Sequence, residues 1–265
     1  MKGIAAPGAV VVVTGAGSGI GHAVAVRYAH LGATVIATDV EESAAKMTAE
    51  ACRQTGVPAF SQYCDVSDAE SVRELSRYVP AQIGPVDILV NNAGVGVAGP
   101  FLATDESDWE WLVSVNLDGV VHGCRYFGAD MVARQRGQIV NVASGAAYLP
   151  NRRIATYCAT KAAVLMLSRC LRADWARHHV GVSAICPGVI NTPILANTRL
   201  RGNAIDEKAR MARIFSLSHS PNTVAKAVTR AAQRNQPMAS VGVEVRVAYQ
   251  VQRLLPILTG AMARL

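Results

Sequence analysis

The stretch VVVVTGAGSGIG, residues 10–21, passes from four consecutive valines directly into a loop that contains four glycines. β-Branched residues favour a buried strand, and the sequence after the loop, HAVAVRYAHLG, has the pattern of a helix. A glycine-rich turn between a strand and a helix lets a pyrophosphate approach the backbone, where free N–H groups and the helix dipole stabilise its charge. The order of strand, glycines and helix favours a nucleotide-binding loop over a turn that only connects the two elements.

The predicted cofactor contacts in this loop are Gly15, Gly17, Ser18, Gly19, Ile20 and Gly21. The spacing is TGxxxGxG, because Ile20 stands where GxGxxG would require its third glycine. Asp39 follows at the end of the next predicted strand, where dinucleotide-binding folds place the acid that hydrogen-bonds the adenosine ribose. Its carboxylate would repel a 2′-phosphate, and the residues just after it offer no arginine. NAD is therefore favoured over NADP as the cofactor. The alternative for Asp39 is that it only forms the turn after the strand.

Length and composition indicate one α/β domain, residues 1–265. Hydrophobic residues make up 51% of the chain and charged residues 17%, so it can fill a core and is not expected to be disordered. The six cysteines lack CxxC spacing, which indicates reduced core thiols of a cytoplasmic protein, with neither a metal site nor disulfides. The first residues have the pattern of neither a signal peptide nor a membrane span.

Seven short β-branched runs alternate with longer helical stretches, which is typical of a doubly wound (Rossmann) domain with a central parallel sheet flanked by helices. The predicted strands are residues 10–13, 34–39, 59–65, 87–91, 138–143, 181–185 and 238–241. A helix start is predicted at Ser107, because SDWE has the serine-to-glutamate spacing of a capping box before an apolar run.

A tyrosine and a lysine lie four residues apart in TYCATK, residues 156–161. On a helix, Tyr157 and Lys161 share one face. A phenol titrates at about 10 and needs a nearby positive charge to act as an acid or base at neutral pH. The pair therefore indicates a tuned proton donor, although the same spacing also occurs by chance in many helices.

With these motifs in place, the sequence resembles the short-chain dehydrogenase/reductase family from about residue 10 to residue 238. The resemblance rests on an ordered set: TGAGSGIG, CDVS at 64–67, NNAG at 91–94, VNLDG at 115–119, a serine at 144, YCATK at 157–161 and PGVINT at 187–192. It implies a catalytic set of Asn116, Ser144, Tyr157 and Lys161. The tyrosine would exchange the proton with the substrate, and the serine would orient the substrate oxygen. The lysine would hold the ribose and lower the tyrosine pKa. The asparagine would anchor a water that relays protons.

The resemblance also implies cofactor contacts outside the glycine loop. These are Asp65, Val66, Asn92, Ala93, Gly94, Tyr157, Lys161, Pro187, Gly188, Val189 and Thr192. Asp65 would bind the adenine edge, and Thr192 would hold the nicotinamide carboxamide. The implied activity is NAD-dependent interconversion of a secondary alcohol and a ketone by hydride transfer. The alternative is an inactive NAD-binding regulatory protein of the same fold, which the intact catalytic set disfavours.

The predicted substrate contacts are Ser144, Tyr148 and Tyr157, and residues 190–216 are the predicted substrate-binding lid. Apolar residues in the corresponding loops, such as Val95, Leu149 and Ile194, favour a bulky substrate such as a steroid, a retinoid or a lipid-derived compound. These residues could equally pack the lid.

The basic balance of the chain lies in its last part. Residues 195–265 carry eleven Lys or Arg against three Asp or Glu, whereas residues 1–194 carry fifteen against sixteen. This part could attract an acidic substrate or an anionic membrane, or its charges could simply be solvated. No nucleic-acid-binding motif is recognised, so nucleic acid is not an expected partner.

Residues 242–265 form a tail without the DGG-like turn that many family members have. The tail places Val243, Val247, Val251, Leu254, Leu255 and Leu258 at helical spacing. We expect it to pack on the same protein or on a partner subunit rather than on a membrane. A homodimer or homotetramer is predicted, with a dimer built through the two long helices that follow Ser107 and Tyr157.

Overall fold

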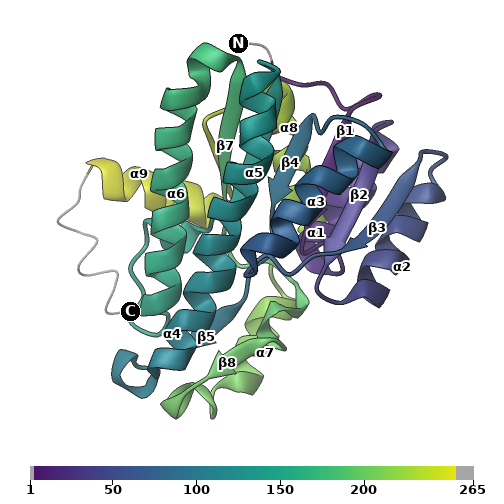
Figure 1. The fold of residues 1–265 in the computed structure, drawn as a ribbon. Helices are drawn as coiled ribbons and strands as arrows, with labels where there is room; N and C mark the ends of the chain where they lie inside the picture. Colours follow the sequence, from purple (N-terminus) through teal and green to yellow (C-terminus); the bar gives the residue numbers. More distant parts are fainter. Residues whose placement is uncertain (1–2, 255–265) are drawn as a thin grey trace.

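The computed structural model describes residues 3–254 and contains a central sheet of seven parallel strands (Figure 1). The strands are β1 (Val10–Thr14), β2 (Thr34–Asp39), β3 (Ala59–Tyr63), β4 (Ile88–Asn91), β6 (Gly137–Val142), β7 (Val180–Pro187) and β9 (Met238–Val241). Their order across the sheet is β3-β2-β1-β4-β6-β7-β9. The predicted strands are confirmed, with bounds that differ by two residues or fewer.

The direction of winding changes beside β1. The chain first builds outward through β2 and β3, then returns to β4 on the other side of β1 and continues to β9. Parallel strands end at the same edge of a sheet, so the loops after β1 and β4 meet at this switch point, where open α/β sheets bind their ligands. The glycine loop follows β1, and the NNAG motif overlaps the end of β4.

Helices cover both faces of the sheet (Figure 1). One face carries α1 (Gly19–His30), α2 (Glu42–Arg53) and α8 (Pro221–Arg234), and the other carries α3 (Ala69–Gln82), α5 (Gly119–Ala133) and α6 (Ala155–Trp175). Valine and alanine dominate the core under α1 and α8, and such small side chains let the helices approach the sheet closely. The central strands are therefore buried on both sides, which fixes the positions of their carboxyl ends.

The helix that carries Asn116 begins earlier than the sequence predicted. α4 (Glu106–Val113) has Asp105 as its N-cap, and a π-helical segment, Ser114–Asp118, joins α4 to α5. The Asp105 carboxylate accepts a hydrogen bond from the N–H of Asp108 at 2.8 Å, and Asp108 accepts one from the N–H of Asp105 at 3.5 Å. The predicted capping box at Ser107 is wrong by two residues, because a carboxylate two positions earlier offers the helix dipole a negative charge.

A second, small sheet is absent from the sequence prediction. It pairs β5 (Gly96–Ala98) with β8 (Thr198–Leu200) in parallel. Residues 190–216 also contain α7 (Lys208–Ser216), which lies with β8 below the main sheet in Figure 1. Short 3₁₀ turns span Phe101–Ala103, Gly145–Ala147, Ala176–His178, Pro193–Leu195 and Gly202–Ala204.

The helix predicted in the tail is α9 (Val243–Leu254), but the predicted apolar stripe is not the face that packs on this chain. Val243, Val247 and Leu254 are 69%, 56% and 71% exposed, whereas Val245 and Ala248 are buried. Two apolar stripes at helical spacing run along α9, and the sequence spacing could not decide between them. Leu255 and Leu258, which were part of the predicted stripe, lie outside the described residues.

None of the helices in residues 3–254 is both long enough and apolar enough to span a bilayer. Within the same residues, no cluster of His, Cys, Asp or Glu suits a metal ion. All six cysteines are free thiols, and four of them are buried as predicted for core residues, while Cys170 is exposed on α6.

Candidate active site

The glycine loop packs too closely against its neighbours to carry side chains at Gly15, Gly17 and Gly21. A Cβ atom on Gly21 would overlap the carbonyl oxygen of Gly15, and one on Gly15 would lie 2.7 Å from the Cα of Ala93. Gly15 also has a φ of +61°, a conformation that favours glycine. The glycines of TGxxxGxG thus let the loop fold against the start of α1 and against the loop after β4.

The NNAG motif holds the glycine loop in place. The Asn92 side-chain amide donates hydrogen bonds to the carbonyl oxygens of Thr14 and Gly15, at 2.9 and 3.0 Å. The Thr14 hydroxyl accepts hydrogen bonds from the N–H groups of Asn92 and Ala93, at 3.0 and 3.2 Å. The two loops are therefore fixed relative to each other by backbone and short side-chain groups alone.

Asp39 ends β2 beside the glycine loop. Its Oδ2 accepts a hydrogen bond from the N–H of Gly17 at 2.8 Å, and its Oδ1 accepts one from the N–H of Glu41 at 3.0 Å. The N–H of Cys64 donates to the Asp39 carbonyl oxygen at 3.1 Å, which brings Asp65 to the same edge of the sheet. The structure therefore places the Asp39 carboxylate against the loop, where the sequence predicted a ribose-binding acid.

The first turn of α1 suits an anionic ligand. In the described structure its N-cap residue, Ser18, makes no side-chain hydrogen bond to the turn, and the turn, which includes Ile20, holds no acidic residue. Helix N-termini with free N–H groups bind phosphate groups. The loop, this turn and Asp39 together fit a dinucleotide, with the pyrophosphate at the turn and the ribose at Asp39.

Asp65 and Val66 follow β3 near Asp39. The Oδ1 of Asp65 accepts hydrogen bonds from the N–H and the hydroxyl of Ser67, at 2.9 and 2.7 Å, which fix the carboxylate. Val66 is buried against Gly119, whose Cβ position would lie 2.8 Å from Val66 Cγ2. Their predicted contacts with the adenine stay predictions.

Residues 187–192 bring another loop toward the glycine loop. Pro187 ends β7 and leads through Gly188 into the exposed Val189. The Thr192 side chain lies 3.1 Å from the place that a Cβ on Gly19 would take. Thr192 thus reaches the glycine loop, and its predicted contact with the nicotinamide stays a prediction.

Ser144, Tyr157 and Lys161 occupy the carboxyl side of β6 and the first turns of α6. The Ser144 Oγ accepts a hydrogen bond from the N–H of Ala146 at 3.1 Å, which caps the 3₁₀ turn. Tyr157 and Lys161 lie one turn apart, with Lys161 Nζ 5.7 Å from the centre of the Tyr157 ring. Tyr157 is half-buried and Lys161 is buried, so a ligand at this edge would meet the phenol with the ammonium beneath it.

Lys161 is a buried cation with unused hydrogen-bond donors. In the described part of the chain, its Nζ makes one hydrogen bond, to the carbonyl oxygen of Val142 at 3.2 Å. An ammonium group has three donors. Burial lowers the pKa of Lys161 to about 8. A buried ammonium with donors to spare fits the hydroxyl groups of a ribose, as the resemblance implied.

The Tyr157 phenol is harder to ionise than the sequence led us to expect. Desolvation raises the pKa of Tyr157 to about 12, and the nearby Ser144 hydroxyl opposes this shift. Lys161 does not counter the rise, because its own pKa of about 8 means that it has lost its proton before the phenol ionises. Among the chain's own groups, Tyr157 is therefore a proton donor, and a further positive charge beside it would lower its pKa.

Asn116 is fully buried in the π-helical segment between α4 and α5. Its Oδ1 accepts a hydrogen bond from the N–H of Val95 at 2.8 Å, and its Nδ2 donates one to the Val95 carbonyl oxygen at 3.0 Å. A Cβ on Gly94 would lie 3.1 Å from Asn116 Oδ1 and 3.4 Å from Lys161 Nζ. π-Helical turns are frequent at functional sites. Asn116 thus fixes the chain after NNAG next to Lys161, and its predicted relay water stays a prediction.

A sequence model of the short chain dehydrogenase family matches residues 9–202. The chain belongs to this family. The matched residues include the glycine loop, NNAG, and the serine, tyrosine and lysine described above.

Known proteins similar to this chain include longer ones. It is 42% identical over 263 residues to the "Probable oxidoreductase EphD" of Mycobacterium tuberculosis. The aligned region covers 96% of this chain and 44% of that protein. The chain thus spans less than half of that relative's length.

Two solved structures share its fold over almost the whole chain. A short chain dehydrogenase/reductase of Burkholderia phymatum in complex with NAD has a TM-score of 0.87 at 29% identity, covering 95% of this chain and 96% of that one. A gluconate 5-dehydrogenase of Burkholderia cenocepacia in complex with NADP and tartrate has a TM-score of 0.78 at 29% identity, covering 91% and 96%. The two neighbours therefore differ in the cofactor that they hold.

The Tyr148 side chain points toward β9 and α9. Its side chain is buried, its hydroxyl is 2.9 Å from the Oγ of Ser240 on β9, and its ring meets that of Tyr249 on α9 edge-on at 5.0 Å. This placement favours a packing role over the predicted substrate contact.

The sequence did not reveal that α9 supports the loops of the candidate active site. The Val245 side chain lies 3.1 Å from the place of a Cβ on Gly145 and 2.7 Å from that of a Cβ on Gly188. Gly145 follows Ser144, and Gly188 follows Pro187. Glycines at both positions were visible in the sequence, but the residue that packs on them is more than fifty positions away and has no local signal.

Proposed function

We propose that this dehydrogenase interconverts a secondary alcohol and a ketone with NAD, with Tyr157 as the acid and base. The observation that carries the proposal is the grouping of Tyr157 with the buried Lys161, whose ammonium keeps unused donors beside Gly94 of the NNAG motif within the described residues. A structural lysine would be expected to use all its donors, because burying an unsatisfied charge is costly. The grouping therefore supports a site that is completed by a ligand.

The chain's own residues can carry out the proton transfer. In the direction of oxidation, Tyr157 accepts the hydroxyl proton of the substrate while Ser144 holds the same oxygen by a hydrogen bond. A bound nicotinamide supplies the hydride acceptor or, when reduced, the hydride donor. In the direction of reduction, Tyr157 donates its proton to the oxygen as negative charge develops there. Lys161 holds the ribose, and a further positive charge beside the phenol, such as that of an oxidised nicotinamide, would favour its ionised form.

Asp39 supports NAD as the cofactor. Its carboxylate lies against the glycine loop at Gly17 and would meet a 2′-phosphate with like charge. Glu41 and Glu42 follow directly and add negative charge. Arginine, the usual partner of a 2′-phosphate, does not occur in the glycine loop or in the residues just after Asp39.

Residues 190–216 are proposed as a lid over an apolar substrate. The segment holds β8 and α7, and Ile194, Leu195, Met211 and Phe215 in it are half-buried. Half-buried apolar side chains can gain contacts with an apolar ligand at little cost to the fold. This supports a bulky secondary alcohol, such as a steroid, a retinoid or a lipid-derived compound.

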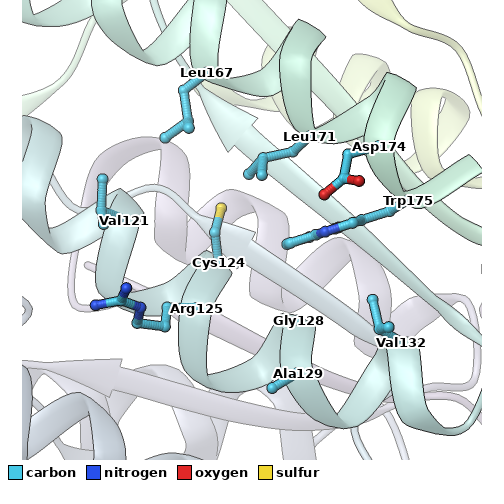
Figure 2. A pocket seen from close by; sticks show the side chains of 10 residues that line it. All are labelled: Val121, Cys124, Arg125, Gly128, Ala129, Val132, Leu167, Leu171, Asp174 and Trp175. Carbon is cyan, nitrogen blue, oxygen red and sulfur yellow. The ribbon is translucent and has the colours of Figure 1, made fainter.

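A homodimer is proposed through the long helices α5 and α6. A groove of about 490 Å³ runs between them (Figure 2). It is lined by Val121, Cys124, Arg125, Gly128, Ala129, Val132, Leu167, Leu171, Asp174 and Trp175, most of them apolar. The groove lies on the helices that the sequence predicted as the dimer face, and the mass of the protein in solution tests the proposal. A homotetramer is the alternative.

The six free cysteines accord with the proposed cytoplasmic location, since a reducing compartment keeps thiols free. The rival function, an inactive NAD-binding regulatory protein, would have no chemical need for Tyr157 and Ser144. It would be favoured if the protein bound NAD and reduced none of it with any secondary alcohol.

The test of the mechanism is Tyr157→Phe, assayed with NAD and a panel of secondary alcohols by the absorbance of the reduced cofactor. The change removes one hydroxyl, so turnover should fall on the order of 10²–10⁴-fold while NAD affinity is kept. Lys161→Ala should lower both the turnover and the affinity for NAD, because the Lys161 ammonium is proposed to hold the ribose.

Tyr148→Phe is the matched control. It removes a hydroxyl that faces Ser240 rather than the site, and it should leave turnover close to that of the wild type. Near-normal turnover by Tyr157→Phe would remove the tyrosine from the mechanism.

A further inference from the structure

Asp108 is a fully buried carboxylate that the proposed mechanism does not use. It lies in the first turn of α4 and accepts two hydrogen bonds from the Arg201 guanidinium, Nε to Oδ2 and Nη2 to Oδ1, both at 2.7 Å. Arg199 Nη1 donates a third, to Oδ1 at 3.2 Å. One buried negative charge is thus matched by two arginines that are 91 and 93 positions away in the chain.

The two arginines hold the middle of the lid strand β8 and the residue that follows it to the body of the protein. Arg199 also stacks its guanidinium 4.0 Å from the centre of the Trp111 ring on α4. Arg201 donates its backbone N–H to the carbonyl oxygen of Ala98 on β5 at 2.8 Å. The side chains of Arg199 and Arg201 are 37% and 35% exposed, so the contact spans from the interior to the surface.

β5 connects this contact to the cofactor site. It follows the NNAG motif by one residue, and Val95 between them is bonded to Asn116. Gly96 lets β8 approach closely, because a Cβ there would lie 2.5 Å from the Thr198 Oγ1. The lid strand is therefore fixed to the same rigid unit that carries the glycine loop.

The rest of the lid is held more weakly. No residue of α7 is buried. Its neighbour Glu207 pairs with Arg153, and the two side chains are 25% and 45% exposed. An exposed ion pair contributes less than a buried, bidentate one. The position of the lid should therefore depend mainly on Asp108.

We propose that Asp108 is the anchor of the substrate lid, a positioning residue that sets the affinity for the alcohol by holding Arg199 and Arg201, without touching substrate or cofactor. The proposal rests on the proposed function, in which residues 190–216 form that lid. In residues 3–254 the Asp108 carboxylate bonds to Arg199, Arg201 and the N–H of Asp105 and not to Ser144 or Tyr157, so its removal frees the lid and leaves the proton-transfer groups in place.

The test is Asp108→Asn, which keeps the shape of the side chain and removes its charge. The KM for the alcohol should rise on the order of tenfold to a hundredfold, since charge-assisted bidentate hydrogen bonds are lost, while kcat and NAD affinity change little. Hydrogen exchange of the backbone amides of residues 198–216 should accelerate by about tenfold or more.

Arg201→Lys keeps the positive charge but cannot form the bidentate contact. It should give a smaller change of the same kind. Arg201 is partly exposed, so this variant also keeps the proposal falsifiable if Asp108→Asn fails to fold.

Asp105→Ala is the matched control, because it removes the N-cap of α4 and leaves the arginine contacts. It should destabilise the protein without the change in KM or in lid exchange. An unchanged KM and unchanged exchange in Asp108→Asn would overturn the proposal, as would an equal effect of Asp105→Ala. If no alcohol is oxidised by the wild type, the proposed function fails, and lid exchange alone still decides whether Asp108 is the anchor.

Discussion

The glycine loop and the lid meet at the same edge of the sheet, yet they are held in opposite ways. The glycine loop is fixed by backbone packing and by four hydrogen bonds between Thr14, Gly15, Asn92 and Ala93, which leave no space for a side chain at Gly21. Beyond the short backbone pairing of β8 with β5, the proposed lid is fixed by long side chains, chiefly Arg199 and Arg201 on Asp108 and Arg153 on Glu207.

The difference separates two requirements of one site. A cofactor of constant shape suits a surface that cannot adjust, whereas a lid must open for each substrate. Backbone packing is insensitive to salt, and ion pairs at the surface are screened by it. The comparison therefore predicts that changes in the loop act on the fold and NAD, and changes in the lid act on the alcohol.

The largest effect is expected for Gly21→Ala. The new Cβ would overlap the Gly15 carbonyl oxygen and lie 2.5 Å from the Asn92 amide nitrogen, neither of which can move without breaking the loop. Overpacking of this kind costs about 3 kcal/mol of stability. Urea unfolding should show that loss, and calorimetric titration should show that NAD binding is lost.

Gly56→Ala serves as its control. Gly56 has a φ of +89° and no atom within 4 Å of its Cβ position, so the change adds backbone strain alone. It should cost less stability and leave NAD affinity unchanged. If both variants lost NAD affinity equally, close packing would not be the cause.

Asp39→Asn should have the next largest effect. The charged acceptor for the Gly17 N–H is weakened, and charge-assisted hydrogen bonds contribute about 1.5–3 kcal/mol, so NAD affinity should fall by about tenfold to a hundredfold. The gap between NAD and NADP should narrow, while the KM for the alcohol at saturating cofactor stays constant. Titration with both cofactors measures this.

Glu42→Gln is the control for Asp39→Asn. It removes a nearby negative charge without removing the hydrogen bond that Asp39 accepts from Gly17. Glu42 is exposed and pairs with Lys46 at 2.8 Å, away from the loop. Its removal should change NAD affinity far less than Asp39→Asn does. Tighter binding of NADP than of NAD by the wild type would contradict the role given to Asp39.

A moderate effect on the free energy of unfolding is expected from a change of pH. The folded state lowers the pKa of Lys161 from 10.5 to about 8, so the unfolded chain binds more protons between these values and stability rises with pH there. Lys161 should contribute a rise of about 1 kcal/mol between pH 7 and pH 9. Buried thiols such as Cys124, whose pKa values are raised from 9, act in the opposite direction over the same range, so the contribution of Lys161 is measured as a difference between two variants.

Lys161→Met supplies the reference for this experiment. Without the titrating group, the change in stability from pH 7 to pH 9 should be about 1 kcal/mol less favourable than in the wild type, as measured by urea unfolding. A variant whose pH profile matched the wild type would show that Lys161 is not desolvated in the folded protein.

The smallest effect is expected for Glu207→Gln in the lid. A partly exposed pair with Arg153 contributes about 0.2–1 kcal/mol, so the KM for the alcohol should rise by about fivefold or less. The difference from the wild type should vanish in 1 M salt, where screening extends over only about 3 Å. NAD affinity should not change.

Glu110→Gln is its control, since Glu110 is exposed on α4 and makes no ion pair in residues 3–254. A KM change that persisted at high salt, or that Glu110→Gln reproduced, would count against an ionic tie at Glu207.

The same contrast explains what the sequence could predict. The strands of the main sheet are runs of β-branched residues, and the glycine loop is a local motif. Both can therefore be recognised from consecutive residues. Asp39 and the pair Tyr157 and Lys161 were found because strand ends and helical spacing locate them without knowledge of distant contacts.

The remaining features depend on residues that are distant in the chain. β5 and β8 have three residues each and pair across about a hundred positions, which leaves no periodic signal. Asp108 looks like a surface acid in DESDWE, and only its burial by Arg199 and Arg201 reveals it. The Tyr157 pKa was expected to fall, but desolvation, which depends on the whole fold, raises it.

The stacking of Arg199 on Trp111 gives the lid an optical reporter. The guanidinium lies 4.0 Å from the centre of the indole ring, and the emission of an indole shifts when a cation leaves its face and water replaces it. The sequence contains two other tryptophans, Trp109 and Trp175, which can be replaced by phenylalanine. The remaining intrinsic fluorescence would then follow opening of the lid in stopped-flow mixing, with no attached dye.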